Sequence, residues 1–166
     1  MKKWQDYKQT YRTESDLFDF ARSGDLRGFA TYLYQHPNVN LNAVNQKGYS
    51  ALMLAVYNGQ QDFCEALLRS GADVHSRDFI ENTVLMASAF KGNLDIVRLL
   101  LDFGASPTDL NETNMNARDW AQMFGRKNIV EFFDEYYPNS NNGSKLKNFL
   151  RFIKLSLVMV LKKIKK

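Results

Sequence analysis

The sequence predicts an all-α solenoid in which short helix-turn-helix pairs stack side by side, and three observations lead to this fold class. A pattern recurs every 33 residues, in residues 50–59, 83–92 and 116–125. Each copy holds a short helix that ends at a glycine after about two turns. A second, amphipathic helix follows each glycine. Helices this short are not stable alone, so neighbouring copies must supply the packing.

The first helix of each copy is predicted between two characteristic terminal residues. A side chain that can accept a hydrogen bond from the free N–H groups of a helix start precedes it. A glycine that suits a left-handed C-terminal position follows it. These residues share one frame, with Ser50, Thr83 and Asn116 at the start and Gly59, Gly92 and Gly125 at the end.

The second helix of each copy is predicted within residues 60–73, 93–106 and 126–138. Aligned apolar positions give each of these helices one apolar stripe, as in Phe63/Cys64, Ile96/Val97 and Ile129/Val130. Turn-forming residues open the successive units, again 33 residues apart, at Asn45, Asp78 and Asn111. The units are therefore helix pairs joined by β-turn fingers.

This frame resembles the ankyrin repeat. The family pattern of a β-turn, a Thr-Pro-Leu-His-like helix start and a Leu-Leu-x-x-Gly-Ala-Asp ending is similar to residues 50–53 with 67–73, and to residues 83–86 with 100–106. The chain departs from the family at the Pro and His positions, which hold Ala51, Val84 and Ala117, and Met53, Met86 and Asp119. We therefore expect somewhat weaker helix caps. In the last copy Tyr137-Pro138 replaces the closing glycine, as expected of a terminal capping unit.

The domain organisation follows from extending this frame in both directions. Upstream residues fit it with a two-residue offset that aligns Gly24 with Gly59. We predict a leader at residues 1–14, a repeat array at 15–137 divided into 15–44, 45–77, 78–110 and 111–137, a polar linker at 138–144 and a basic amphipathic helix at 145–166. The leader has no apolar segment behind its lysines, so it is not expected to be a secretory signal. Its aromatic residues, Trp4, Tyr7 and Tyr11, either dock on the first repeat or belong to a disordered segment.

Charge divides the chain into two parts of opposite sign. Residues 1–144 hold 14 Lys and Arg against 18 Asp and Glu, whereas residues 145–166 hold eight basic residues and no acidic one. The longest uncharged stretch of this basic tail, residues 155–161, is seven residues, while a bilayer span needs about 20. The tail suits an anionic membrane surface. The expected membrane-contacting residues are Lys145, Lys147, Phe149, Arg151, Lys154, Leu157, Lys162, Lys163, Lys165 and Lys166.

Two other roles for the tail stay open at this stage. It could pack back on the array, or it could bind a partner helix or nucleic acid, of which nucleic acid is the least favoured. The composition suits a cytoplasmic protein with peripheral membrane contact, in which the single cysteine, Cys64, is a core residue rather than a nucleophile.

The sequence contains no pattern typical of catalysis. The two histidines, His36 and His75, have no partner at metal-ligand spacing. The glycines fall one per helix end rather than in a phosphate-binding loop. We therefore expect no catalytic residue, no metal, no cofactor and no enzymatic activity.

Protein binding remains, and the resemblance implies where it occurs. In ankyrin proteins the turn and the end of the first helix line a concave surface that contacts the partner. The corresponding residues are Gln46, Lys47, Tyr49, Tyr57, Asn58, Phe79, Ile80, Asn82, Phe90, Lys91, Glu112, Thr113, Met115, Met123 and Phe124. Phe79 and Ile80 are expected at a turn tip that the fold does not need. Alternatively, Phe90, Met123 and Phe124 pack between neighbouring repeats.

The predicted function is a non-enzymatic interaction scaffold for a protein partner that the sequence does not identify. Two alternatives remain. The chain could act through its basic tail as a membrane-active or nucleic-acid-binding protein, or it could be an accessory protein that supports a partner enzyme.

Overall fold

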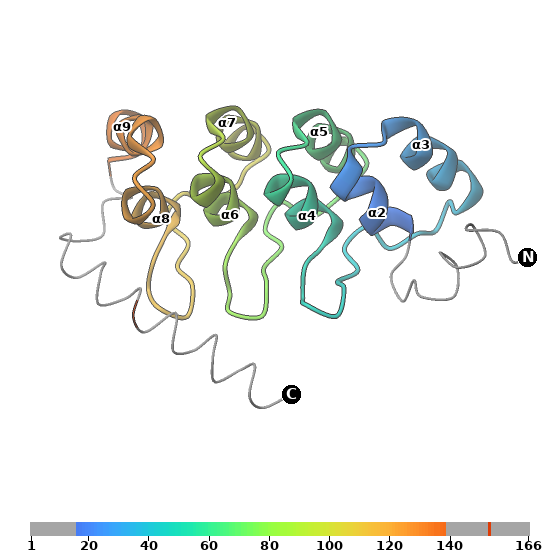
Figure 1. The fold of residues 1–166 in the computed structure, drawn as a ribbon, viewed down its shortest axis with the longest axis horizontal. Helices are drawn as coiled ribbons and strands as arrows, with labels where there is room; N and C mark the ends of the chain where they lie inside the picture. The colour runs from blue at the N-terminus through green and yellow to red at the C-terminus, as the bar shows by residue number, and fades with distance from the viewer. Residues whose placement is uncertain (1–15, 139–152, 154–166) are drawn as a thin grey trace, which may run out of the picture.

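A computed structural model describes residues 16–138 and residue 153. Within them, eight helices form four consecutive pairs, in agreement with the predicted all-α solenoid. An inner row consists of α2 (Asp16–Ser23), α4 (Ala51–Tyr57), α6 (Val84–Lys91) and α8 (Ala117–Met123). An outer row consists of α3 (Leu26–Gln35), α5 (Gln61–Arg69), α7 (Leu94–Asp102) and α9 (Lys127–Tyr136). Figure 1 shows the two rows as parallel layers, with long loops projecting from the inner row.

The inner helices begin at the predicted caps. The side chains of Ser50, Thr83 and Asn116 accept hydrogen bonds from backbone N–H groups three residues later, at 3.1, 3.2 and 3.0 Å. In α8 the Asp119 carboxylate also accepts from the Asn116 N–H at 3.4 Å, which completes a reciprocal capping box. The replacement of the family's His thus leaves the N-cap hydrogen bond intact in all three helices.

The inner helices end at glycines, as predicted. Gly59, Gly92 and Gly125 have φ values of 71°, 85° and 69°. Residues that carry a side chain rarely adopt this left-handed backbone conformation. The glycines therefore allow the chain to turn directly from each inner helix into the outer helix that follows. This explains how a helix of two turns can be stable: it ends where its partner begins and packs against that partner.

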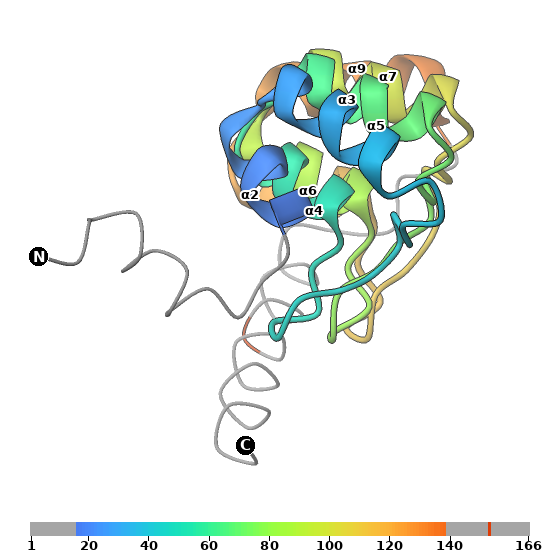
Figure 2. The same cartoon turned by 90° about the vertical axis from the view of Figure 1, so that its right-hand side faces the viewer.

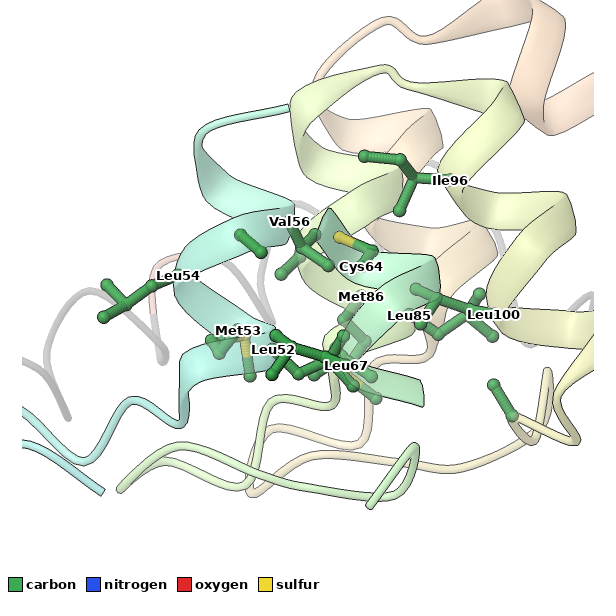
Figure 3. Packing of buried hydrophobic residues seen from close by; sticks show 14 of the residues in the cluster. Leu52, Met53, Leu54, Val56, Cys64, Leu67, Leu85, Met86, Ile96 and Leu100 are labelled. Atoms are coloured by element: carbon green, nitrogen blue, oxygen red, sulfur yellow. The ribbon is translucent and has the colours of Figure 1, made fainter. Parts of the chain in front are cut away.

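The core lies between the two rows and runs through all four repeats. Leu52, Leu67, Leu85 and Leu100 are at most 1% exposed, and Figure 3 shows inner-row and outer-row side chains meeting between the layers. Cys64 is fully buried, and burial raises the pKa of its thiol to about 12. The cysteine is therefore a core residue, as predicted.

The loops between repeats are fingers, each closed by one polar side chain. The Oδ1 atoms of Asn45, Asp78 and Asn111 each accept two backbone hydrogen bonds, at 2.9 to 3.1 Å. The last two fingers are also joined, because Asn111 Nδ2 donates to Asn82 Oδ1 at 2.7 Å. Figure 2, a view along the stack, shows the fingers projecting together from the inner row. They form one wall of the concave surface, and the inner helices form the other.

The last repeat replaces an apolar contact surface with a polar one. Positions that hold Leu52 and Leu85 in earlier repeats hold Arg118 here, and Asp134 takes a position that is Leu in the repeats before it. Arg118 donates to both carboxylate oxygens of Asp134, at 2.6 and 2.8 Å, and to Gln122 Oε1 at 2.9 Å. These hydrogen bonds lower the pKa of Asp134. Such polar cover is what the end of a repeat stack requires.

Candidate functional site

The structure divides the predicted contact residues into three groups by exposure. Exposed members are Gln46, Lys47, Asn58, Phe79, Lys91 and Glu112. Half-buried members are Tyr49, Tyr57, Phe90, Met123 and Phe124. Buried members are Ile80, Asn82, Thr113 and Met115. Only the first two groups have side chains that a partner could reach.

The half-buried aromatic residues form a continuous row, which we call the aromatic ladder: Tyr49, Tyr57, Phe90 and Phe124. Their ring centroids are 5.5 Å apart for Tyr49 and Tyr57, 6.3 Å for Tyr57 and Phe90, and 4.6 Å for Phe90 and Phe124. The last three rings come from successive repeats, at or just beyond the C-terminal ends of α4, α6 and α8. The ladder thus crosses three repeats along the concave surface.

The ladder ends on Trp120, which the sequence analysis did not single out. This indole ring stacks on Phe124 at 5.5 Å and meets Phe90 edge-on at 5.9 Å. The equivalent positions in earlier repeats are Leu54 and Ala87, so the alignment gave no sign of an aromatic contact here. Within the described part of the chain, the buried Trp120 Nε1 has no hydrogen-bond acceptor. An unmet buried donor costs about 1–3 kcal/mol.

The sequence left two roles open for Phe90, Met123 and Phe124, namely contact with a partner and packing between repeats. The structure is compatible with both. Phe90 contacts both Trp120 and Phe124 of the next repeat, so it does pack between repeats. All three side chains nevertheless keep part of their surface exposed. Packing between repeats therefore fixes the ladder without covering it.

The ladder is electrically neutral at physiological pH. Burial, and then the nearby Tyr49 and Asp78, raise the pKa of the Tyr57 hydroxyl. Burial and Asp78 likewise raise the pKa of Tyr49. Both hydroxyl groups stay protonated, so each can donate or accept a hydrogen bond at the edge of an apolar surface.

The expectation that the fold does not need Ile80 is wrong. Ile80 is only 6% exposed, and its carbonyl oxygen accepts from the Glu112 N–H of the following finger at 3.4 Å. Asn82, Thr113 and Met115 are also buried, at 2%, 1% and 0% exposure. These four side chains are therefore too buried to contact a partner directly.

Phe79 differs from its neighbour, being 50% exposed. Its ring lies over Gly48 at the tip of the preceding finger, where an added Cβ atom would come within 2.7 Å of the ring. Gly48 also has a φ of 78°, which residues with a side chain rarely adopt. Both the close approach of the ring and the backbone conformation therefore require glycine at this position. Phe79 therefore offers an exposed ring face and also connects two fingers.

Replacing these two residues separately tests this division. Ile80→Ser removes a buried apolar side chain and inserts a hydroxyl, so we expect a loss of about 2–4 kcal/mol in the free energy of unfolding. Phe79→Ser is expected to cost less than about 1 kcal/mol, because half of the ring is already in water. Chemical denaturation of both variants gives the comparison. Equal losses would show that the burial assigned to Ile80 is wrong.

The described residues contain neither a metal site nor a helix that could span a membrane. Among residues 16–138 no group of three His, Cys, Asp or Glu side chains is placed to hold a metal ion. None of the helices in this part of the chain is both long and apolar enough to cross a membrane. The predicted leader and all but one residue of the basic tail lie outside the described residues. The exception, Ile153, is helical and 51% exposed.

Comparison with known proteins points to one family. A family model described as "Ankyrin repeats (3 copies)" matches residues 8–78, and one described as "Ankyrin repeat" matches residues 81–120. Protein phosphatase 1 regulatory subunit 27 of Mus musculus is 32% identical over 117 residues, which are 70% of this chain and 75% of that protein. Inactive serine/threonine-protein kinase TEX14 of Bos taurus is 30% identical over 122 residues. Protein fem-1 homolog A-like of Mus musculus is 32% identical over 100 residues.

Some of these relatives are much longer than this chain. The matched part is 72% of this chain but 8% of TEX14, and 60% of this chain but 15% of the fem-1 homologue. The similarity to these two proteins therefore concerns only a small part of each.

Proposed function

Because the chain belongs to the ankyrin repeat family, we propose that it is a non-enzymatic interaction scaffold that binds a protein partner on its concave surface. The observation that carries this proposal is the aromatic ladder. Four half-buried rings in mutual contact extend over three repeats and keep part of their surface exposed. A surface that served only to face water would rarely hold such a row of aromatic side chains.

The ladder has the physical properties of a binding hot spot. Aromatic side chains contribute much of the binding energy at protein interfaces, particularly near the centre of the contact. Here the rings are held by one another and by the buried Trp120, which contacts both Phe90 and Phe124. A partner would therefore bind rings that are already ordered, which lowers the entropy cost of association.

A more specific role is suggested by one relative. The match covers 75% of the length of the protein phosphatase 1 regulatory subunit. The regulatory role that its name states therefore belongs to a protein that consists mostly of the matched region. The second candidate function is accordingly that of an accessory subunit that binds and regulates a partner enzyme. In that case the enzyme would occupy the same concave surface.

We further propose that residues 145–166 contact an anionic membrane surface, while the repeats bind the partner. The support is in the sequence, where eight basic residues and no acidic one accompany an apolar stripe. Each basic residue near such a surface contributes about 1 kcal/mol. The competing functions, in which the tail itself is membrane-active or binds nucleic acid, differ in assigning no binding role to the ladder.

Truncation after residue 144 separates these functions. The shortened chain is expected to keep partner capture and to lose binding to acidic vesicles. In the full chain, vesicle binding should weaken as salt rises, because exposed charges are screened over about 10 Å at 0.1 M ionic strength. Leu157→Asp should weaken it even at low salt by placing a charge in the apolar stripe.

Co-sedimentation with acidic and neutral vesicles, and a parallel titration with nucleic acid, give the readout. Loss of partner capture on truncation would favour a tail-centred function. If Leu157→Asp leaves vesicle binding unchanged but destabilises the array, the tail packs on the repeats instead.

A further inference from the structure

The first repeat exchanges a small and a large side chain relative to the later repeats, in the frame that aligns Gly24 with Gly59. Phe20 of α2 replaces a small residue, which in the later inner helices is Ala55, Ser88 and Ala121. Gly28 of α3 replaces a large apolar residue that is at most 1% exposed, namely Phe63, Ile96 and Ile129. The two changes depend on one another, because a Cβ atom at Gly28 would come within 2.6 Å of the Phe20 ring.

The exchanged positions belong to the face that a repeat turns toward the repeat before it. Phe63 contacts Phe29 of the first repeat, with ring centroids 4.9 Å apart. Gly28 occupies the position equivalent to Phe63, but no repeat precedes α2 and α3 within the described chain. Figure 1 shows these two helices at one end of the stack. The exchange therefore shapes an end face that no neighbouring repeat covers.

This end face contains a groove of about 410 Å³, which we call the end groove. Its apolar wall consists of Phe20 and Tyr32, whose rings meet edge-on at 5.9 Å, and His36 stacks on Tyr32 at 4.4 Å. Both wall residues are half-buried. The residues equivalent to Tyr32 in the later repeats are 0% exposed, namely Leu67, Leu100 and Phe133. The end groove thus leaves open an aromatic surface at a position that the other repeats bury.

The two ends of the stack differ in how they are closed. In the last repeat the ion pair of Arg118 and Asp134 supplies polar cover. The equivalent positions of the first repeat hold Leu17 and Leu33. Because the terminal units of a solenoid need a polar outer face, cover for the first repeat has to come from another segment.

The predicted leader, residues 1–14, offers a matching surface. It lies outside the described residues, but its sequence places three aromatic residues three and four positions apart: Trp4, Tyr7 and Tyr11. Such spacing puts side chains on one face of a helix, and only polar residues stand between them. An aromatic stripe with a polar opposite face is what a terminal cap requires.

The leader is also close enough to reach the end groove. It directly precedes α2, and Phe20 lies four residues after the start of this helix, about 6 Å along its axis. Residues 12–15 provide a link of up to about 13 Å between the aromatic stripe and α2. The stripe can therefore fold back onto Phe20 and Tyr32 without a change in the described fold.

We propose that the leader docks in the end groove and caps the stack, with its aromatic stripe on Phe20 and Tyr32. The docked leader excludes other proteins, including a second copy of this chain, from the end face. The end groove is separate from the aromatic ladder, so this inference is independent of the proposed function.

Fluorescence of Trp4 in the full-length protein tests this proposal. Trp120→Phe is introduced into every sample, so that Trp4 is the single tryptophan. Thr31→Arg then places a long charged side chain in the groove from an exposed position, and Ala30→Arg is the matched change at an exposed position outside it. We expect acrylamide to quench Trp4 severalfold more strongly in Thr31→Arg, up to the level of a free peptide of residues 1–14. Ala30→Arg should leave Trp4 shielded.

Circular dichroism and a concentration series accompany each quenching measurement. Trp4 quenched as strongly as the free peptide in all folded variants would overturn the proposal, because the leader would then be undocked. Shielding that survives Thr31→Arg would place Trp4 elsewhere on the protein and would equally reject the end groove. Shielding that appears only as concentration rises, together with a dimer in sedimentation velocity, would assign the end face to a second copy instead.

Discussion

Leu100→Ala is expected to lower the free energy of unfolding by about 2–5 kcal/mol, because it leaves a cavity in the middle of the stack. Leu100 is 0% exposed, and α7 packs against α6 within its own repeat and against α5 of the repeat before it. A solenoid has no distant contacts that could compensate for such a loss, since each repeat contacts only its neighbours.

The matched control for Leu100→Ala is Leu110→Ala, the same change at a side chain that is 41% exposed. Its effect should stay within about 0.5 kcal/mol. Thermal and chemical unfolding of both variants give the comparison. A shift of less than about 2 °C for Leu100→Ala would contradict the repeat frame on which the fold rests.

Phe90→Ala is expected to abolish partner capture. Phe90 is the central ring of the ladder, with Tyr57 on one side and Phe124 and Trp120 on the other. Truncating it removes a contact surface and also releases the neighbouring rings, so the loss should reach that of a hot spot, about 2 kcal/mol or more. This corresponds to a decrease in affinity of roughly 30-fold or more.

Two further variants distinguish recognition from folding. Phe90→Leu keeps an apolar side chain of similar reach and should restore part of the capture. Tyr136→Ala removes an aromatic side chain that is 60% exposed on α9, and capture should be unchanged. Melting temperatures are measured for all three proteins. Full capture by Phe90→Ala would mean that the ladder is structural only.

The periodic features of the fold could be predicted from the sequence. Caps such as Ser50 and Thr83, and terminators such as Gly92, act through bonds to their immediate neighbours, so their chemistry is local. The apolar stripes were equally clear, because each repeat must bury one face on the next. The cap residues and the apolar stripes recur at equivalent positions in successive repeats. This recurrence made the prediction of the fold specific.

Contacts between repeats were harder to predict. Ile80 looked dispensable in its own turn, but its side chain is buried and its backbone is hydrogen-bonded to the next finger. Arg118 and Asp134 occupy positions that hold Leu in the two repeats before, yet only the approach of α8 to α9 shows that they bind one another. Trp120 joined the ladder for the same reason, since its partner Phe90 comes from another repeat. Such pairings depend on how repeats stack, which a position-by-position alignment does not contain.

Site-specific photo-crosslinking tests the central claim, that the concave aromatic ladder is the partner-binding surface. A photoreactive phenylalanine analogue replaces Phe90 on α6 in one protein and Phe132 on α9 in another; both are half-buried phenylalanines, one in each helix row. After irradiation in a lysate of cells that express the protein, position 90 should give a discrete covalent adduct with a partner protein, and position 132 should give none. An adduct formed from position 132 alone, or equally from both positions, would contradict the account.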